Sequence, residues 1–263
     1  MPFALLHSRP KISLLHATRG RPQRAREARE RWLDCASLVG RVEHRFAIDA
    51  DDVTCLRAMS SSRPLIVRQP GGGCVAAWNL AARRSRGDVL VQLSDDWLPI
   101  SGWDEQFLDR LGDLRRPAVM RPSDGHRDDE LLCMAILTRA RLRQQQTLFH
   151  PGYTGLYSDD EFSFRAYQDG VVIDARDLVL THDHPNYNTA QSMDETYLRQ
   201  NDPERERAGR RLFLERNPRA KGHWIHEGEW RRHFVPLPAG QSWTQNLNPN
   251  TLRPKAEVKP SLA

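Results

Sequence analysis

The sequence has no apolar stretch long enough to cross a bilayer. A membrane helix needs roughly 20 consecutive apolar residues, and no such run occurs in the 263 residues. The first 15 residues interrupt their apolar side chains with His7, Arg9, Pro10 and Lys11, which is not the pattern of a secretory signal. The sequence therefore predicts a cytoplasmic protein with no transmembrane segment.

Cysteine is scarce, and the common glycine-rich nucleotide motifs are missing. The four cysteines are far apart and match no zinc-site spacing: Cys35, Cys55, Cys74 and Cys133. In a cytoplasmic chain we expect reduced, half-buried thiols. The run Gly71–Gly73 is not a GxGxxG motif and lacks the lysine of a P-loop. These absences argue against a zinc domain, a dinucleotide site and a P-loop ATP site.

What the chain does contain is enough apolar and charged surface for a folded domain. Hydrophobic residues make up 39% and charged residues 28% of the sequence, with a mean hydropathy of -0.67. That is too apolar for a wholly disordered chain. The 39 Lys and Arg exceed the 34 Asp and Glu by five. This balance fits either a phosphate-bearing partner or a solvated surface with a slight basic excess.

Short apolar runs alternate with helical patterns in the first half of the chain. The predicted strands cover residues 12–17, 45–48, 65–68 and 88–93. Helices are predicted over 22–36 and 75–86. This alternation predicts an α/β fold with a mostly parallel central sheet flanked by helices. In such sheets, ligands bind beyond the carboxyl ends of the strands.

The second half of the chain has a different pattern. We expect a strand over 131–138, a short helix over 158–167 and an extended run over 171–181. From residue 236 onward the sequence is rich in Pro, Asn and Lys, which predicts a loose tail.

Adjacent carboxylates follow the most apolar predicted strand. Val89–Leu93 leads directly into Ser94, Asp95 and Asp96. Mg²⁺ or Mn²⁺ bridging a diphosphate takes one or two carboxylates together with phosphate oxygens. A turn in which an aspartate caps the next element is the alternative interpretation.

A second acidic run opens the helix predicted over 158–167. Ser158 and Glu161 have the spacing of a capping box. Asp159 and Asp160 would then lie at the positive end of the helix dipole. The functional alternative is that one of these two carboxylates faces a cleft as a general base. The two interpretations are compatible, because a cap fixes the direction of its neighbour.

Two histidines follow the extended run near residue 181. His182 and His184 flank Asp183, and strand alternation predicts that both point to one side. They are candidates for a metal or phosphate contact, or else ordinary packed residues. No third ligand at a recognisable spacing indicates zinc.

Basic and polar residues near the first strand and first glycines could contact a nucleotide. Arg19 and Arg21 follow the first strand, where guanidinium groups bind phosphate or a base. Gly72 precedes a predicted helix that carries Asn79. A basic surface loop and a solvated asparagine are the alternatives.

Taken together, these stretches resemble the nucleotide-sugar-dependent glycosyltransferases of family 2, which have the GT-A fold. The similar stretches are 12–22, 46–52, 72–87 and 93–96, and the resemblance covers roughly residues 11–190. It implies a domain over 11–200 with a C-terminal helical extension and tail over 201–263. Its Rossmann-like half, residues 11–120, would bind the nucleotide sugar, and residues 121–200 would form the acceptor and catalytic half.

The resemblance also implies roles for individual residues. The donor site would include Thr18, Arg19, Arg21, Asp49, Asp51, Gly72, Asn79 and Asp95. Ser94–Asp96 stands where the family has its Asp-x-Asp motif. Because the first Asp is Ser here, Asp96 becomes the expected ligand of Mn²⁺ or Mg²⁺, with His182 or His184 nearby.

The resemblance further implies an inverting transfer of a sugar from a nucleoside-diphosphate sugar to an acceptor hydroxyl. Ser158-Asp159 occupies the family's Glu-Asp pair, so Asp159 is the expected general base and Asp160 its rival. The acceptor stays open between a glycan, a lipid-linked sugar, a protein and a nucleic acid.

Two other functions remain as alternatives. A sugar-phosphate nucleotidyltransferase also uses an α/β sheet and metal-binding carboxylates, but its glycine-rich loop with a Lys is missing after the first strand. A non-catalytic nucleic-acid-binding protein would use the arginines of 19–31 and the basic stretch 205–232. That alternative leaves the paired carboxylates without a purpose.

Overall fold

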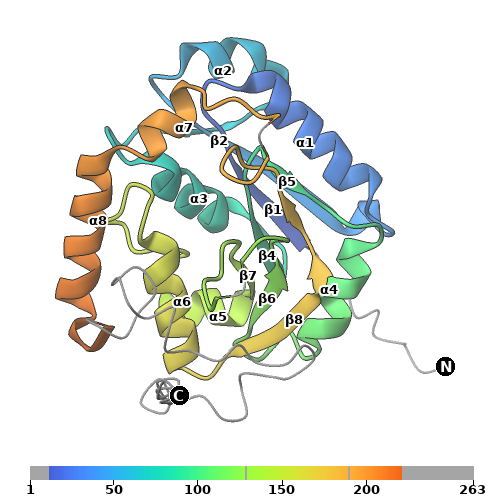
Figure 1. The fold of residues 1–263 in the computed structure, drawn as a ribbon. Coiled ribbons are helices and arrows are strands. Elements are labelled where there is room, and N and C mark those ends of the chain that lie inside the picture. The colour runs from blue at the N-terminus through green and yellow to red at the C-terminus, as the bar shows by residue number, and fades with distance from the viewer. Residues whose placement is uncertain (1–11, 128, 189, 221–263) are drawn as a thin grey trace, which may run out of the picture.

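A seven-stranded sheet in the order β3-β2-β1-β4-β7-β6-β8 organises the part of the chain that the computed structural model describes, residues 12–127, 129–188 and 190–220 (Figure 1). Its strands are β1 (Ile12–Ala17), β2 (Val42–Asp49), β3 (Leu65–Val67), β4 (Val89–Leu93), β6 (Val119–Ser123), β7 (Ile136–Thr138) and β8 (Val172–Val179). A two-stranded ribbon is formed by β5 (Trp97–Leu98) and β9 (Thr181–His182). The helices are α1 (Pro22–Asp34), α2 (Val53–Ala58), α3 (Gly73–Arg84), α4 (Trp103–Leu111), α5 (Arg139–Gln145), α6 (Ser158–Gln168), α7 (Glu195–Gln200) and α8 (Pro203–Arg216).

The sheet is mostly parallel, as the sequence predicts. Strands β3, β2, β1 and β4 run parallel to one another, and β6 is parallel to β8. Strand β7 runs antiparallel to both β4 and β6. The carboxyl ends of β1, β2 and β4 therefore meet at one edge of the sheet, where ligands are expected.

Apolar side chains alternate between the two faces of the sheet and build a core on each. From β1, Leu15 packs into the core that includes residues of α3 and α6, whereas Leu14 packs with residues of α1 and α4. On the second face, two buried tryptophans connect α1 to α4. The indole N–H of Trp103 donates to the backbone carbonyl of Trp32 at 2.7 Å. Burial on both faces explains the apolar, non-alternating strand sequences.

Several predicted elements are confirmed, and one is shorter than expected. The structure has strands at β1, β2, β3 and β4, helices at α1, α3 and α6, and the extended run at β8. The strand predicted over 131–138 covers only Ile136–Thr138. Upstream, the backbone N–H of Leu132 donates to the Ser163 hydroxyl at 2.9 Å, and that of Ala135 donates to the Gln92 side chain at 2.8 Å. Side-chain oxygens thus accept hydrogen bonds from the backbone N–H groups that a longer strand would pair with a neighbouring strand.

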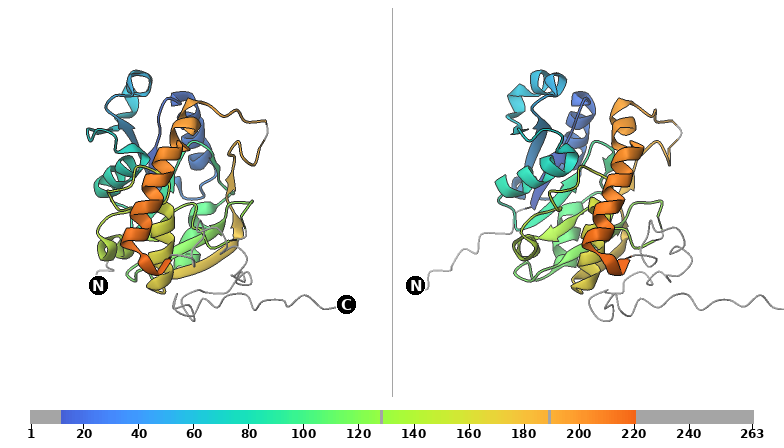
Figure 2. Two further views of the ribbon diagram at one scale, coloured as in Figure 1. Left: turned by 60° about the vertical axis from the view of Figure 1, so that its left-hand side comes forward. Right: turned by 90° about the vertical axis from the view of Figure 1, so that its left-hand side faces the viewer.

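The end of the described chain returns over the first half of the molecule. The ribbon pairs Trp97 with His182. After it, α7 lies against the loop between β1 and α1, where the Thr196 hydroxyl donates to the Arg19 carbonyl at 3.0 Å, and α8 runs beside α6 (Figure 2). Helix α8 falls within the predicted extension, whereas the tail predicted from residue 236 lies outside the described residues. Within the described part of the chain, no helix combines the length and hydropathy that a bilayer span requires.

Candidate active site

A cleft of about 270 Å³ opens at the carboxyl edge of β1, β2 and β4. It is bordered by the start of α3, the start of α6, the β5–β9 ribbon and the α7–α8 segment. Nine of the predicted site residues line it: Thr18, Arg19, Arg21, Asp49, Asp95, Asp96, Asp159, His182 and His184. Segments more than 100 residues apart thus contribute to one cavity.

Asp95 is held inside the scaffold at the end of β4. Its carboxylate lies 2.9 Å from Nε2 of His16 and accepts a 2.9 Å hydrogen bond from the Thr18 hydroxyl. The other ring nitrogen of His16 is 3.0 Å from Nε2 of His44. Burial lowers the pKa of His44 well below its usual value, and the charge of His16 adds to this effect. Asp95 therefore fixes the end of β1 against the end of β4.

Arg19 is committed to two aspartates after β2. Its guanidinium donates to Asp49 at 2.9 Å and to Asp51 at 2.7 and 2.9 Å. The hydrogen bond that Arg19 donates to Asp51 raises the pKa of Arg19, which is already far above neutrality. Asp49 lines the cleft, whereas Asp51 is exposed beside it. The three side chains form a rigid polar wall suited to hydroxyl and ring-nitrogen groups.

The carboxylate of Asp96 is surrounded by hydrogen-bond donors. It accepts hydrogen bonds from Ser94 at 2.8 Å and from the Tyr197 hydroxyl at 3.0 Å, and Nε2 of His182 lies 3.4 Å away. Burial alone would raise the pKa of Asp96, but His182, Ser94 and Tyr197 together hold it well below its usual range. A carboxylate that is only 5% exposed is thereby kept negatively charged.

The two predicted histidines lie together beside Asp96. The His182 ring stacks on Trp97 with centroids 4.4 Å apart, and the His184 ring is 5.3 Å from that of His182. Nδ1 of His184 accepts from the backbone N–H of Asn186, so the neutral ring has its proton on Nε2, which can act as a hydrogen-bond donor. Burial, together with the nearby His182, lowers the pKa of His184. Among the described residues, no group of three or more His, Cys, Asp or Glu side chains could by itself hold a metal ion.

Arg21 anchors the segment that covers the cleft. It forms a two-pronged ion pair with Asp194, which also caps α7. Its guanidinium carbon lies 3.7 Å from the centre of the Tyr197 ring. Arg21 therefore holds α7, and with it the Tyr197 hydroxyl, against Asp96. Sequence reasoning missed Asp194 and Tyr197, because no local pattern connects them to the first strand.

The three acidic residues at the start of α6 have different surroundings. Asp159 is half-buried and lines the cleft, whereas Asp160 is 1% exposed and does not line it. The Ser163 hydroxyl donates to the Asp159 carbonyl at 2.6 Å, which ties this first turn to the next. Asp159 and Asp160 therefore lie in different surroundings despite being adjacent.

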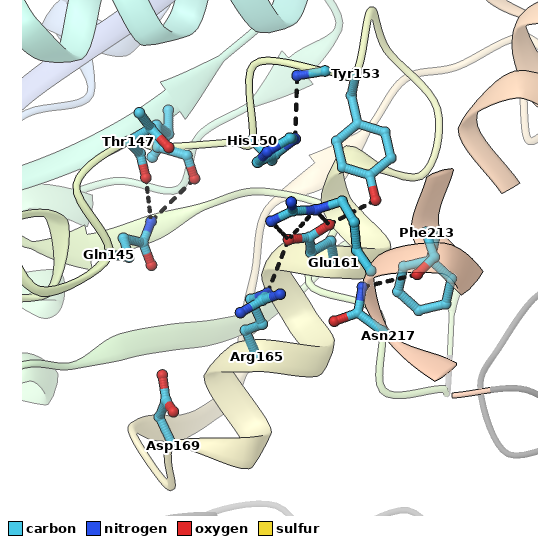
Figure 3. Close-up of polar contacts among 12 residues, drawn as sticks. Gln145, Thr147, His150, Tyr153, Glu161, Arg165, Asp169, Phe213 and Asn217 are labelled. Carbon is cyan, nitrogen blue, oxygen red and sulfur yellow. Dashed lines mark hydrogen bonds and ion pairs between the residues drawn. The ribbon is translucent and has the colours of Figure 1, made fainter. Parts of the chain in front are cut away.

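The capping box predicted for α6 is wrong. The N-cap is Tyr157, in a left-handed conformation with φ of 70°, and Ser158 is already helical. Glu161 turns away from Ser158 and accepts from Tyr153 at 2.7 Å and from Arg165 at 2.8 Å (Figure 3). Arg216 of α8 donates to it as well. These charged partners outcompete a backbone N–H for the Glu161 carboxylate.

Gly72 and Asn79 do not line the cleft. Gly73 borders it instead, with φ of 59°, and a Cβ atom there would overlap the Thr154 carbonyl. The Asn79 amide donates to the Phe149 carbonyl at 2.8 Å and accepts from the Phe149 N–H at 3.0 Å. Asn79 therefore holds the loop before α6, and its placement does not support a ligand contact.

No protein-family model matches the sequence, and comparison with curated proteins finds no match either. Solved structures do match. S. aureus TarS 1–349 in complex with UDP-GlcNAc has a TM-score of 0.55 at 12% identity, over 83% of this chain and 75% of that one. The mannosyltransferase PcManGT from Pyrobaculum calidifontis, in complex with GDP-Man and Mn²⁺, has a TM-score of 0.53 at 13% identity, over 81% and 76%.

A further match shows how much longer a similar protein can be. Another S. aureus TarS chain matches with a TM-score of 0.52 at 13% identity, over 66% of this chain but only 37% of that one. This chain thus spans well under half of that protein's length. The likenesses confirm the GT-A-like fold expected from the sequence.

Proposed function

We propose that this protein is a metal-dependent, inverting glycosyltransferase that uses a nucleoside-diphosphate sugar. One observation carries the proposal: a single cleft in a GT-A-like sheet has the charged Asp96 beside two histidines on one wall and the Asp159 carboxylate on another. The solved neighbours add support, since their structures contain UDP-GlcNAc in one case and GDP-Man with Mn²⁺ in another.

In this proposal, the donor occupies the half of the cleft formed by residues 11–120. Thr18, Arg19 and Asp49 bind the nucleoside. The hydrogen bond from Thr18 to Asp95 and the hydrogen bond from Arg19 to Asp49 hold these side chains in position. Thr18 donates to Asp95, so its hydroxyl oxygen still has lone pairs to offer the donor. The acceptor half is formed by residues 121–200.

A divalent metal fits the donor set beside β4. The carboxylate of Asp96 is an oxygen ligand of the kind that Mn²⁺ and Mg²⁺ prefer. His182 or His184 would add an imidazole nitrogen, and for His184 this requires Nδ1 to release the Asn186 N–H. Because the described residues supply no larger cluster, diphosphate and water oxygens have to complete the coordination shell, as is common for Mg²⁺. When bound, the ion neutralises charge that develops on the departing diphosphate.

Asp159 acts as the general base in this scheme. Its carboxylate takes the proton of the acceptor hydroxyl, whose oxygen attacks the anomeric carbon. The bond between that carbon and the diphosphate oxygen breaks, and its electron pair leaves with the nucleoside diphosphate. Attack opposite to the leaving group inverts the anomeric centre.

A panel of nucleotide sugars tests the proposal. The protein is incubated with UDP-, GDP- and dTDP-linked sugars, with Mn²⁺ or with a chelator, and release of nucleoside diphosphate is measured. We expect release from at least one donor, and thermal stabilisation by the matching diphosphate only when Mn²⁺ is present.

The same assay also tests the alternative function, that of a sugar-phosphate nucleotidyltransferase. Sugar 1-phosphates and nucleoside triphosphates are supplied in a parallel arm, and pyrophosphate is measured. Pyrophosphate release without any diphosphate release would overturn the proposal in favour of a nucleotidyltransferase. Failure of every nucleotide to stabilise the protein would also contradict it.

A further inference from the structure

We propose that the acceptor carries an acidic group, a phosphate or a carboxylate, and that Arg205 of α8 binds it. This inference rests on the proposed glycosyl transfer and adds the chemical class of the acceptor. The observations behind it are the charge pairing in the cleft, the packing of α8 and the place of Arg205 on that helix.

The four arginines that line the cleft fall into two kinds. Arg19 and Arg21 are ion-paired with aspartates. Arg199 and Arg205 make no ion pair with a carboxylate among the residues that the structure describes. A cation that faces a partly enclosed cavity without a counter-ion is a natural site for an anionic ligand.

The two arginines without an ion pair lie on different helices, Arg199 on α7 and Arg205 on α8. The charge of Arg199 lowers the pKa values of Asp49 and Asp51, although other influences on those two groups are larger, so it lies near the nucleoside wall. Arg205 also lines the cleft, and it lies on the helix that packs against α6.

Close packing fixes where Arg205 lies relative to Asp159. Gly209, one turn further along α8, is so close to the preceding loop that an added Cβ atom would be 2.6 Å from the Leu156 carbonyl oxygen. That loop leads through Tyr157 directly into the helix turn that holds Asp159. A Cβ atom at Gly155 would likewise meet Gln200, which also lines the cleft. Arg205 therefore belongs to the same wall of the cavity as the proposed base.

Arg205 does not stabilise the helix that carries it. Asp202 caps α8 by accepting from the backbone N–H groups of Glu204 and Arg205. Arg205 is thus in the first turn, where the helix dipole disfavours a positive charge. Its neighbours Glu204 and Glu206 have the sign that the dipole favours. A role in the cleft accounts for a cation at this unfavourable position.

An acidic group bound by Arg205 would orient the acceptor. With one end of the acceptor held by a two-pronged guanidinium contact, its hydroxyl is directed toward Asp159 on the same wall. Neutral polyols would lack this contact and would react with a higher KM.

The test uses acceptors that differ in one group, together with matched variants. Glycerol, glycerol 3-phosphate and glycerate are compared as acceptors. Inorganic phosphate is titrated onto the free protein and onto protein saturated with UDP or GDP and Mn²⁺. The variants are Arg205→Gln, which removes the charge, Arg205→Lys, which keeps it, and Arg207→Gln, a control on the same helix whose side chain is exposed and outside the cleft.

We expect phosphate to bind the nucleotide-loaded wild type, and glycerol 3-phosphate or glycerate to be preferred over glycerol. Arg205→Gln should weaken phosphate binding by about 10- to 100-fold, the range for losing a charge-assisted hydrogen bond. Arg205→Lys should recover most of the affinity, and Arg207→Gln should match the wild type. Nucleotide affinity should stay unchanged in all three variants.

Phosphate could reach this site as part of a small molecule or of a lipid headgroup. A second arm therefore measures co-sedimentation with phosphatidylcholine vesicles that contain phosphatidylglycerol. Dependence on Arg205 in that arm alone would assign the acceptor to a lipid surface.

The outcomes separate this inference from the proposed function. If nucleotides bind but phosphate binds the wild type and Arg205→Gln equally, the acceptor inference is wrong and the glycosyl-transfer proposal stands. If no nucleotide binds, the proposed function fails. Arg205-dependent binding of phosphate to the free protein would then still establish the anion site, and its absence would remove it.

Discussion

Two pairs of adjacent aspartates, Asp95-Asp96 and Asp159-Asp160, each contribute to the cleft, and the fold places their side chains differently. Asp95 and Asp96 follow a buried strand, where successive side chains point to opposite sides. Asp95 turns back to His16 and Thr18 on β1, and Asp96 turns to Tyr197 and the ribbon histidine. Both carboxylates are buried, and both are fixed by donors.

Asp159 and Asp160 begin a helix, where successive side chains are about 100° apart. Asp159 faces the cleft and Asp160 faces the interior, while the next residue, Glu161, reaches arginines on a third side. In the proposed function, the carboxylate assigned to the metal ion, Asp96, is held by several hydrogen-bond donors. The carboxylate assigned to proton transfer, Asp159, is half-buried and lines the cleft. Four substitutions can break or sharpen this contrast.

The largest effect is expected from Asp159→Asn. This change keeps the side-chain volume but removes the proton acceptor, so transfer should fall by about 10²- to 10⁴-fold while donor binding stays near normal. Steady-state kinetics with a donor identified in the panel provides the measurement. Asp160→Asn is the matched control and should leave kcat near the wild-type value. If Asp160→Asn is the inactive variant, the base has been assigned to the wrong aspartate.

A smaller effect is expected from Asp96→Asn. Loss of the negative charge should reduce the Mn²⁺-dependent affinity for UDP or GDP on the order of 10- to 100-fold, as for groups that hold or support a metal ligand. Calorimetry with Mn²⁺ and with a chelator measures it. Asp109→Asn, an exposed change on α4, is the control. Equal affinity of wild type and Asp96→Asn under both conditions would show that Asp96 plays no part in metal-assisted binding.

Glu161→Gln should act on stability instead of on catalysis. The variant loses the charge paired with Arg165 and Arg216, and we expect a decrease of about 2 kcal/mol in the free energy of unfolding. This is less than for a fully buried pair because both arginines reach solvent.

The effect of Glu161→Gln should also depend on pH. Burial opposes ionisation of Glu161, but hydrogen bonds from Arg216 and Tyr153 bring its pKa below the ordinary 4.5. A lowered pKa stabilises the fold above pH 4.5, and this contribution is lost as the pH falls through the folded-state pKa. Urea unfolding of both proteins from pH 7 to pH 3 should show the difference shrinking in acid. A constant difference would contradict the ionic origin.

The smallest effect is expected from Asp95→Asn. The amide can still bond to Thr18 or His16, so we expect a loss of about 1 kcal/mol of stability with little change in nucleotide affinity. Thermal unfolding measures the change in stability, and nucleotide titration measures the change in affinity. A tenfold loss of nucleotide affinity without any change in stability would mean that Asp95 contacts the ligand directly.

Local sequence was a good guide to the elements of the first half. Apolar runs and turn residues predicted β1, β3 and β4 closely, and the carboxylates after β4 drew attention to the right edge of the sheet. These features succeed because strand and helix patterns depend on residues close in the chain. The GT-A-like fold could therefore be expected from the order of the motifs.

Contacts between distant residues could not be predicted in this way. Arg21 pairs with Asp194, 173 positions away, and Tyr197 reaches Asp96 across 101 positions. The capping box failed for the same reason, since Glu161 is bound by an arginine 55 positions further on. Local spacing contains no information about partners that only chain folding brings together.

The sequence by itself thus determined most strands of the sheet, three of its flanking helices and the set of polar residues at its carboxyl edge. Only the tertiary structure decided which of those residues face the cleft. It committed Arg19 and Arg21 to aspartates, Asn79 to a loop and Asp95 to a buried histidine, and it left Arg199 and Arg205 without a carboxylate partner among the described residues. The physical reason is competition: each charged or polar group pairs with the best donor or acceptor within reach, and what lies within reach is set by the packing of the whole chain.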